Sequence, residues 1–245
     1  MRHLTLDEMK TVRLMNRVDT KFVTHQQRLL SILALACEKG YQVQCTAGPI
    51  NGYDSTYYDT SDWAMFTMHH NRKLHRYKIR SRTYLDSKVS FLEIKDKNNK
   101  GRTSKKREKV NSTDPAVLQS DYGLEYFVKL YTGFDFPRLL PTLQTKFHRI
   151  TLVNSQKTER ITVDIGVNFK NVRTGQTAAL DNLVIIELKQ DGRYPSTMRA
   201  ILNQLRIKPF HISKYCMGVA LTYPNVKKNR FKRKLHLLNK IKSTL

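Results

Sequence analysis

Residues 74–85, LHRYKIRSRTYL, carry a positive charge at every second position of their central part. Alternate side chains of an extended strand share one face, so four cations would form a single row: Arg76, Lys78, Arg80 and Arg82. Neighbours in such a row lie about 7 Å apart and repel by roughly 2 kcal/mol at an effective dielectric of about 20. The segment therefore predicts either a strand that binds a polyanion or a solvated basic edge strand.

The same alternation recurs along the chain, with charges on one face and aliphatic side chains on the other. It is found in residues 17–23, 89–97, 103–110, 157–165 and 183–190. Three amphipathic segments, residues 24–39, 114–131 and 197–205, have the spacing of helices that need an apolar sheet surface to cover. We therefore predict an α+β fold: an antiparallel closed β-barrel with a polar cationic lumen and helices packed outside. A sandwich with its charged faces in water is the alternative.

Local signals place further elements. Thr24 is the expected N-cap of a helix that ends at Gly40, and Asp114 with Pro115 begins another. Residues 1–16 are expected to form a docking helix. The remaining strands are expected at residues 53–59, 142–153 and 214–222.

The composition points to an anionic partner. The chain has 245 residues and a formal net charge of +24, which predicts nucleic acid, nucleotide, polyphosphate or an acidic membrane surface. Three cysteines without CxxC spacing indicate neither a zinc site nor a disulfide framework, and no apolar run suggests a signal peptide or membrane span. We expect a cytoplasmic protein, free or peripheral at the inner face of the membrane.

The C-terminal tail differs from the rest of the chain. We predict a main domain over residues 1–223 and a basic tail over residues 224–245, which contains KKNRFKRK. Apolar residues of the tail recur at helical spacing, so the tail is expected to be either an amphipathic helix or a frayed, solvated end: Phe231, Leu235, Leu238 and Ile241. As a helix it could dock on an acidic membrane surface or a membrane protein partner.

The charged faces suit a chain of phosphates. Arginine forks bind phosphate oxygens in pairs and lysines act as point charges. Glu187 is the first candidate for holding Mg²⁺ or Mn²⁺, followed by Glu93, Asp19 and Asp164. A structural salt bridge is the alternative role of each acid. Phosphoryl transfer requires little beyond positioning and charge neutralisation.

Six motifs together resemble one known family. These are RVDTKFV, STYYDTSD, RYKIRSR, FLEIKDKNNKGRTSKKR, IIELK and FHISKYCMGVA, in matching order over about residues 13–223. The chain resembles the polyphosphate polymerase (VTC) domain of the vacuolar transporter chaperone complex in its stand-alone bacterial form, within the CYTH-like triphosphate tunnel metalloenzymes. The resemblance implies a tunnel of about eight antiparallel strands and transfer of the γ-phosphate of ATP to a growing polyphosphate chain, with a divalent metal.

The resemblance also implies roles for individual residues. Phosphate binding falls to Lys21, Arg80, Arg82, Lys95, Lys105 and Arg149, metal binding to Glu187, and the tunnel lysines are Lys189 and Lys214. We expect the catalytic set to be Lys21, Arg80, Arg82, Lys95 and Arg149, and the remaining phosphate-binding set to be Arg76, Lys78, Lys105, Lys189 and Lys214.

Departures from the family pattern bear on the reaction. Hydrolytic members of the superfamily begin with two glutamates and a lysine at alternate positions, where this chain has Arg17, Asp19 and Lys21. The lost acid weakens metal-activated attack by water and favours the polymerase branch. The family pattern has a tyrosine two residues before the arginine that corresponds to Arg149, and this chain has Phe147 at that position.

Three alternatives remain beside a polymerase. A tripolyphosphate or nucleoside triphosphate hydrolase would share the fold, and a polyphosphate-binding module without catalysis would share the cations. A nucleic-acid-binding module is disfavoured, because no RNA-binding aromatic motif is present and alternating cations within strands do not form stacking platforms.

Overall fold

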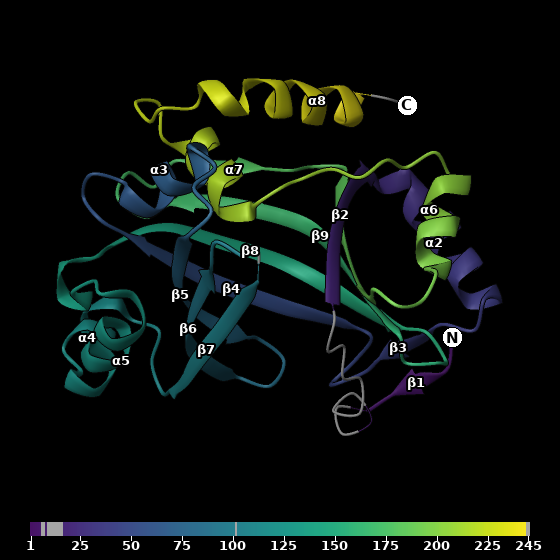
Figure 1. The fold of residues 1–245 in the computed structure, drawn as a ribbon, viewed down its shortest axis with the longest axis horizontal. Helices are drawn as coiled ribbons and strands as arrows, with labels where there is room; N and C mark the ends of the chain where they lie inside the picture. Colours follow the sequence, from purple (N-terminus) through teal and green to yellow (C-terminus); the bar gives the residue numbers. More distant parts are fainter. Residues whose placement is uncertain (6–7, 9–16, 101, 244–245) are drawn as a thin grey trace.

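The computed structural model describes residues 1–5, 8, 17–100 and 102–243, which form a strongly curved antiparallel sheet with helices around it (Figure 1). The main path of the sheet runs β2-β11-β9-β8-β4-β5-β6-β7. Its strands are β2 (Arg17–His25), β4 (Ile50–Asp59), β5 (Arg76–Tyr84), β6 (Val89–Lys97), β7 (Thr103–Val110), β8 (Leu140–Val153), β9 (Glu159–Asn171) and β11 (Leu183–Asp191). Three short strands lie off this path: β1 (His3–Leu4), β3 (Gln42–Gln44) and β10 (Thr177–Ala179).

Two helix pairs cover the outer, aliphatic face of the sheet, as the alternating pattern predicts. The first pair, α2 (Leu29–Glu38) and α6 (Thr197–Gln204), packs on aliphatic side chains of β9 and β11. The second pair, α4 (Pro115–Gln119) and α5 (Tyr122–Thr132), packs on Ile79, Leu92 and Ile94 of β5 and β6. The two pairs lie at opposite sides of the molecule (Figure 1). The predicted α+β fold with an antiparallel sheet and outer helices is therefore confirmed.

Closure of the sheet into a barrel stays a prediction. Among the described residues the path of paired strands has two ends, β2 and β7. Both ends nevertheless border one cavity, described below.

Residues 214–222 do not form the predicted final strand; that prediction is wrong. They form α7 (Lys214–Thr222), which begins at the N-cap Ser213 and is buried on almost all sides. At Gly218 the helix lies so close to the sheet that an added Cβ would be 2.6 Å from Phe169 Cδ1. A helix buried on every side has no polar stripe, so its sequence lacks the 3.6-residue period.

The tail forms α8 (Lys232–Ser243), the helical one of the two predicted alternatives. Its apolar stripe packs on the protein itself: Phe231 and Leu238 are buried, and Leu235 and Ile241 contact the same cluster. Only the basic outer face of α8 is left for an acidic membrane surface, and such docking stays a prediction, as does the domain boundary at residue 223.

Several boundaries differ from expectation. Thr24 is not an N-cap, because β2 continues to His25 and α2 begins at Leu29. The predicted end at Gly40 is confirmed by its φ of 76°. Asp114 caps α4 as predicted. A further short helix, α3 (Ala64–His70), precedes β5. The expected docking helix of residues 1–16 falls mostly outside the described residues. No helix in the described ranges is both long and apolar enough to cross a membrane.

Candidate functional site

The inner face of the sheet carries the predicted row of cations. On β5 the row runs from Arg76 to Arg82, and strand pairing places Lys95 of β6 between Lys78 of β5 and Lys105 of β7. Like charges directly opposite one another destabilise a sheet unless something compensates them. The arrangement therefore has the character of an anion-binding surface.

This inner face borders a cavity of about 650 Å³. Five predicted site residues line it: Lys21, Arg76, Lys78, Lys95 and Glu187. They come from β2, β5, β6 and β11, and Thr103 of β7 lies at the same cavity. The two ends of the sheet path thus border one cavity, and its volume is within the range of about 300–1,000 Å³ typical of ligand sites.

Five of the predicted cations are paired with carboxylates, and we call them the paired cations. Arg80 donates from Nε and Nη2 to Glu93 Oε2 at 2.8 and 2.6 Å, and Lys105 forms an ion pair with the other oxygen of Glu93. Arg149 binds both oxygens of Asp164 at 2.6 and 2.9 Å. Lys214 also pairs with Asp164, and Lys189 pairs with Glu187 and Asp19. None of the paired cations lines the cavity; they lie on neighbouring parts of the same inner face.

The other five predicted cations form no ion pair with a carboxylate among the described residues. We call them the open cations: Lys21, Arg76, Lys78, Arg82 and Lys95. Lys21 Nζ donates to the carbonyl of Ile212 at 3.1 Å, and Lys78 Nζ to Ser213 Oγ at 3.2 Å. Arg76 donates to a backbone carbonyl at 2.6 Å, and Arg82 to Ser55 Oγ at 2.9 Å. Within the described part of the chain, no hydrogen bond or ion pair reaches Lys95 Nζ. Four of the five open cations line the cavity.

The pKa is raised for Arg80, a paired cation, and lowered for Arg82, an open cation. Burial opposes the charge of Arg80, but Tyr57 and Glu93 outweigh it and raise the pKa of the guanidinium above its usual value. Burial and the Arg80 charge lower the pKa of Arg82 to about 10.

The open lysines of β5 and β6 show the same imbalance. Burial lowers the pKa of Lys78, and the charge of Arg80 together with burial holds the pKa of Lys95 well below its usual value. Burial also lowers the pKa of the paired Lys105 and Lys214, although each has a carboxylate beside it. Among the described residues, the cations that line the cavity thus outnumber its two acids, Asp19 and Glu187.

Aromatic rings flank the arginines, and the sequence analysis assigned them no role in the site. Arg82 lies 5.3 Å from the ring centroid of Tyr53, and Arg149 lies 5.1 Å from the same ring. Arg80 donates to the hydroxyl of Tyr57 at 3.0 Å. Burial raises the pKa of Tyr57, but Arg80, Arg82 and Lys78 outweigh it and lower the value to about 8. The available signal was the alternation of Tyr53, Ser55 and Tyr57 on one face of a strand.

Glu187 is one of two acids that line the cavity, together with Asp19. Burial disfavours its charge, but Lys21 and Lys189 hold its pKa well below the usual value. Lys189 Nζ lies between two carboxylates, 2.5 Å from Glu187 Oε1 and 3.1 Å from Asp19 Oδ2. The described residues contain no group of three or more metal-ligating side chains. Two carboxylate ligands fit Mg²⁺ or Mn²⁺ where substrate phosphates supply further oxygens.

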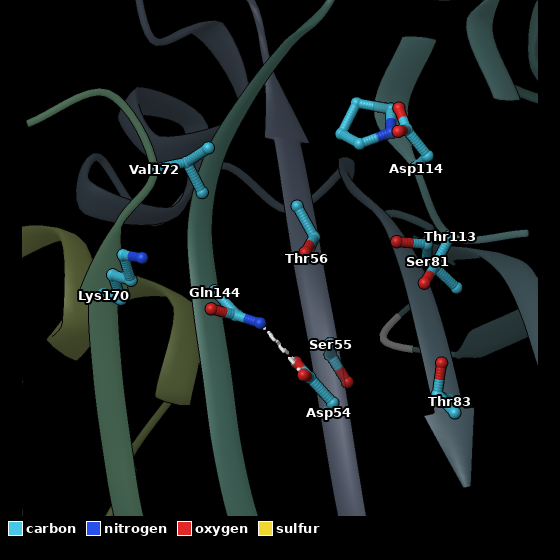
Figure 2. A pocket seen from close by; sticks show the side chains of 11 residues that line it. Asp54, Ser55, Thr56, Ser81, Thr83, Thr113, Asp114, Gln144, Lys170 and Val172 are labelled. Carbon is cyan, nitrogen blue, oxygen red and sulfur yellow. Dashed lines mark hydrogen bonds between the residues drawn. The ribbon is translucent and has the colours of Figure 1, made fainter. Parts of the chain in front are cut away.

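A second hollow, of about 330 Å³, lies on the outer face of β4 and β5 (Figure 2). Hydroxyl groups of Thr56, Ser81, Thr83 and Thr113 line it, and the Gln144 amide donates to Asp54 at 2.9 Å. Its charged residues are Asp54, Asp114 and Lys170, so it lacks the excess of cations found inside. The inner cavity is therefore the candidate site for an anion.

Solved structures share this fold. A putative adenylate cyclase from Vibrio parahaemolyticus matches with a TM-score of 0.51 at 13% identity, covering 84% of this chain and 99% of the other. One from Bacillus halodurans has the same TM-score and identity, covering 81% and 96%. HpAC1 from Hippeastrum, a putative adenylyl cyclase described as having a dominant triphosphatase activity, matches at 0.54 and 12% identity, covering 85% and 98%. These identities establish the fold alone.

The VTC domain model matches residues 16–223, which is most of the chain. The protein therefore belongs to the VTC domain family, as the six motifs predicted. No curated protein matches the sequence.

Proposed function

We propose that this protein is a polyphosphate polymerase that transfers the γ-phosphate of ATP to a growing polyphosphate chain. The observation that carries the proposal is the convergence of four open cations and Glu187 on one cavity. A chain of phosphates supplies the missing negative charge at regular intervals, and membership of the VTC domain family supports that choice of ligand.

The substrate chain would lie in a tunnel. Lys21 of β2 and Thr103 of β7 line the same cavity although their strands are the two ends of the sheet path. We infer that β2 and β7 close around the bound phosphates, which gives the predicted barrel with its cationic lumen.

The transfer step needs no general base from the protein. An oxygen of the terminal chain phosphate, already anionic, attacks the γ-phosphorus of ATP and forms the new P–O–P bond. The bond from the γ-phosphorus to the β–γ bridging oxygen breaks, and its electron pair leaves with ADP. The open cations would align the two anions and reduce their repulsion, while Arg80, Arg82 and Arg149 continue the cationic surface beside them.

Glu187, with Asp19 across Lys189, would hold the Mn²⁺ or Mg²⁺ that neutralises charge on the phosphates. The Lys189 ammonium already places a positive charge between the two carboxylates. Its presence there supports the view that this pair of acids accepts a cation.

A hydrolase of tripolyphosphate or nucleoside triphosphates is the second candidate. The triphosphatase activity described for HpAC1, which shares the fold, favours it. The single acid of the β2 segment, Asp19 next to Lys21, argues against it, because activation of water by a metal calls for more carboxylate ligands.

One assay separates the candidates. The protein is incubated with ATP and Mn²⁺, and the products are resolved on a gel stained for polyphosphate. A polymerase gives long chains and ADP, whereas a hydrolase gives only short phosphates. Glu187→Gln should lower turnover about 100-fold while phosphate binding changes less, and the exposed Glu38→Gln serves as the control. Binding of phosphates with no product from ATP would indicate a sensor instead.

A further inference from the structure

The C-terminal helix α8 contributes to the cavity wall although it lies beyond the residues that match the family model. The match ends at residue 223, whereas Phe231 and Lys234 both line the cavity. From its sequence the tail is predicted to be a separate basic segment. Its side chains are instead part of the candidate site.

The short 3-10 helix Asn229–Phe231, directly before α8, is fixed in place by buried contacts. Phe231 is 6% exposed, and its ring centroid lies 5.8 Å from that of Phe66 and 5.4 Å from that of His70. His70 Nε2 lies 2.7 Å from Asn229 Oδ1, within hydrogen-bond distance. Because Phe231 is anchored, Lys234, about one turn later on the same helix face, is held at the cavity.

Lys234 shares the cavity wall with three cations at or near the ends of β5 and β6, and we call this part of the cavity its mouth. Arg76 begins β5 and pairs in register with Lys97, which ends β6. Arg72 lies in the turn that precedes β5, and all three line the cavity with Lys234. Burial and the charges of Arg72 and Lys21 lower the pKa of Lys234. This mouth therefore holds a group of cations that an anion would stabilise.

We propose that Lys234 binds phosphate units of a long polyphosphate chain at the mouth where the chain passes the start of α8. The inference rests on the proposed function and extends it to a residue outside the family domain. Lys78 and Lys95 line the cavity further along β5 and β6 than the Arg76–Lys97 pair, so the mouth should contact phosphates distant from the reacting γ-phosphate. Lys234 should matter more for long chains than for tripolyphosphate.

Calorimetric titration of the full chain with tripolyphosphate and with long-chain polyphosphate tests this. Lys234→Ala should bind the long chain about 10- to 100-fold more weakly, the loss expected for one charge-assisted contact, and tripolyphosphate nearly as well as the wild type. The matched control is Arg233→Ala, which removes the same charge one residue away from an exposed position outside the cavity. It should bind both ligands as the wild type does.

The outcomes are distinguishable. Equal long-chain affinity for Lys234→Ala and Arg233→Ala, with the wild type binding normally, would overturn the inference and leave the proposed function intact. Equal losses for both ligands in Lys234→Ala would overturn the position at the mouth. A wild type that binds neither phosphate would overturn both proposals. Lys234→Gln, which keeps most of the side chain, repeats the test if the alanine variant melts at a lower temperature.

Discussion

The paired and the open cations share one face of a sheet but differ in what balances their charge. Glu93 and Asp164 each neutralise two of the paired cations, and these acids are 0% and 2% exposed. Within the described ranges, the open cations form hydrogen bonds to hydroxyl groups or backbone carbonyls, or to no group at all, and none forms an ion pair with a carboxylate. Carboxylates of the protein balance the paired cations, whereas the charge of the open cations is available to an anionic ligand.

This difference separates stability from function. Removing one partner of a buried ion pair leaves an uncompensated charge and is strongly destabilising. Removing an open cation relieves repulsion among its neighbours, so the fold should not suffer. Mutations in the two groups should therefore have opposite effects on stability.

The largest effect is expected for Glu93→Gln. The change leaves Arg80 and Lys105 without their carboxylate, and we expect a loss of about 3–5 kcal/mol in the free energy of unfolding. Chemical denaturation followed by circular dichroism measures it. The control is Glu108→Gln on the neighbouring β7, an exposed acid. A loss no larger than that of the control would show that Glu93 does not hold the paired cations in place.

The second largest effect is expected for Lys95→Met. Polyphosphate synthesis from ATP and Mn²⁺ should fall about 10²–10³-fold, which is the loss typical when one electrostatic contact to the transition state is removed. Its thermal midpoint should equal or exceed that of the wild type, because Lys95 is repelled by Arg80. Lys106→Met, which removes an exposed lysine from β7 at the position paired with Ile94, is the matched control. A Lys95 variant that unfolds at low salt would contradict the division into two groups.

The alternation of charges made much of this site readable from sequence. Lys78, Arg80 and Arg82 alternate with uncharged residues, and β5 could be recognised because a period of two is unambiguous when the two faces differ so strongly. The turn at residues 85–88 also implies the β5–β6 hairpin that brings Arg80 opposite Glu93.

Other features depend on tertiary packing and had no local signal. Most residues of α7 are buried, so its sequence has no polar face that would mark a helix. Its β-branched and aromatic residues are also typical of a strand. Lys95 and Glu187 are far apart in sequence, and only the curvature of the sheet brings their charges together. The role of Lys234 required knowing where α8 packs.

Tripolyphosphate should stabilise the wild type by supplying charge to the open cations. At about 100 times its dissociation constant, a ligand adds about 2.7 kcal/mol to the free energy of unfolding, which corresponds to a rise of roughly 5–10 °C in the thermal midpoint of a chain this long. Differential scanning calorimetry with and without the ligand measures the shift. Lys95→Met should shift much less at the same concentration, while Lys106→Met should match the wild type. Equal shifts in all three would place the binding elsewhere.

The smallest effect is a change of stability with pH. Lys78 and Lys95 have lowered pKa values when folded, and Tyr57 has a value of about 8. Between pH 8 and about 10 the unfolded chain therefore binds more protons at these groups than the folded chain, so the free energy of unfolding should rise with pH, on the order of 1 kcal/mol. Bound tripolyphosphate should flatten the rise, because phosphates near the lysines restore their pKa values. Chemical unfolding curves between pH 8 and about 10 measure this free energy, with Lys78→Met as the comparison. A free energy of unfolding that falls as the pH rises in the ligand-free protein would contradict the prediction.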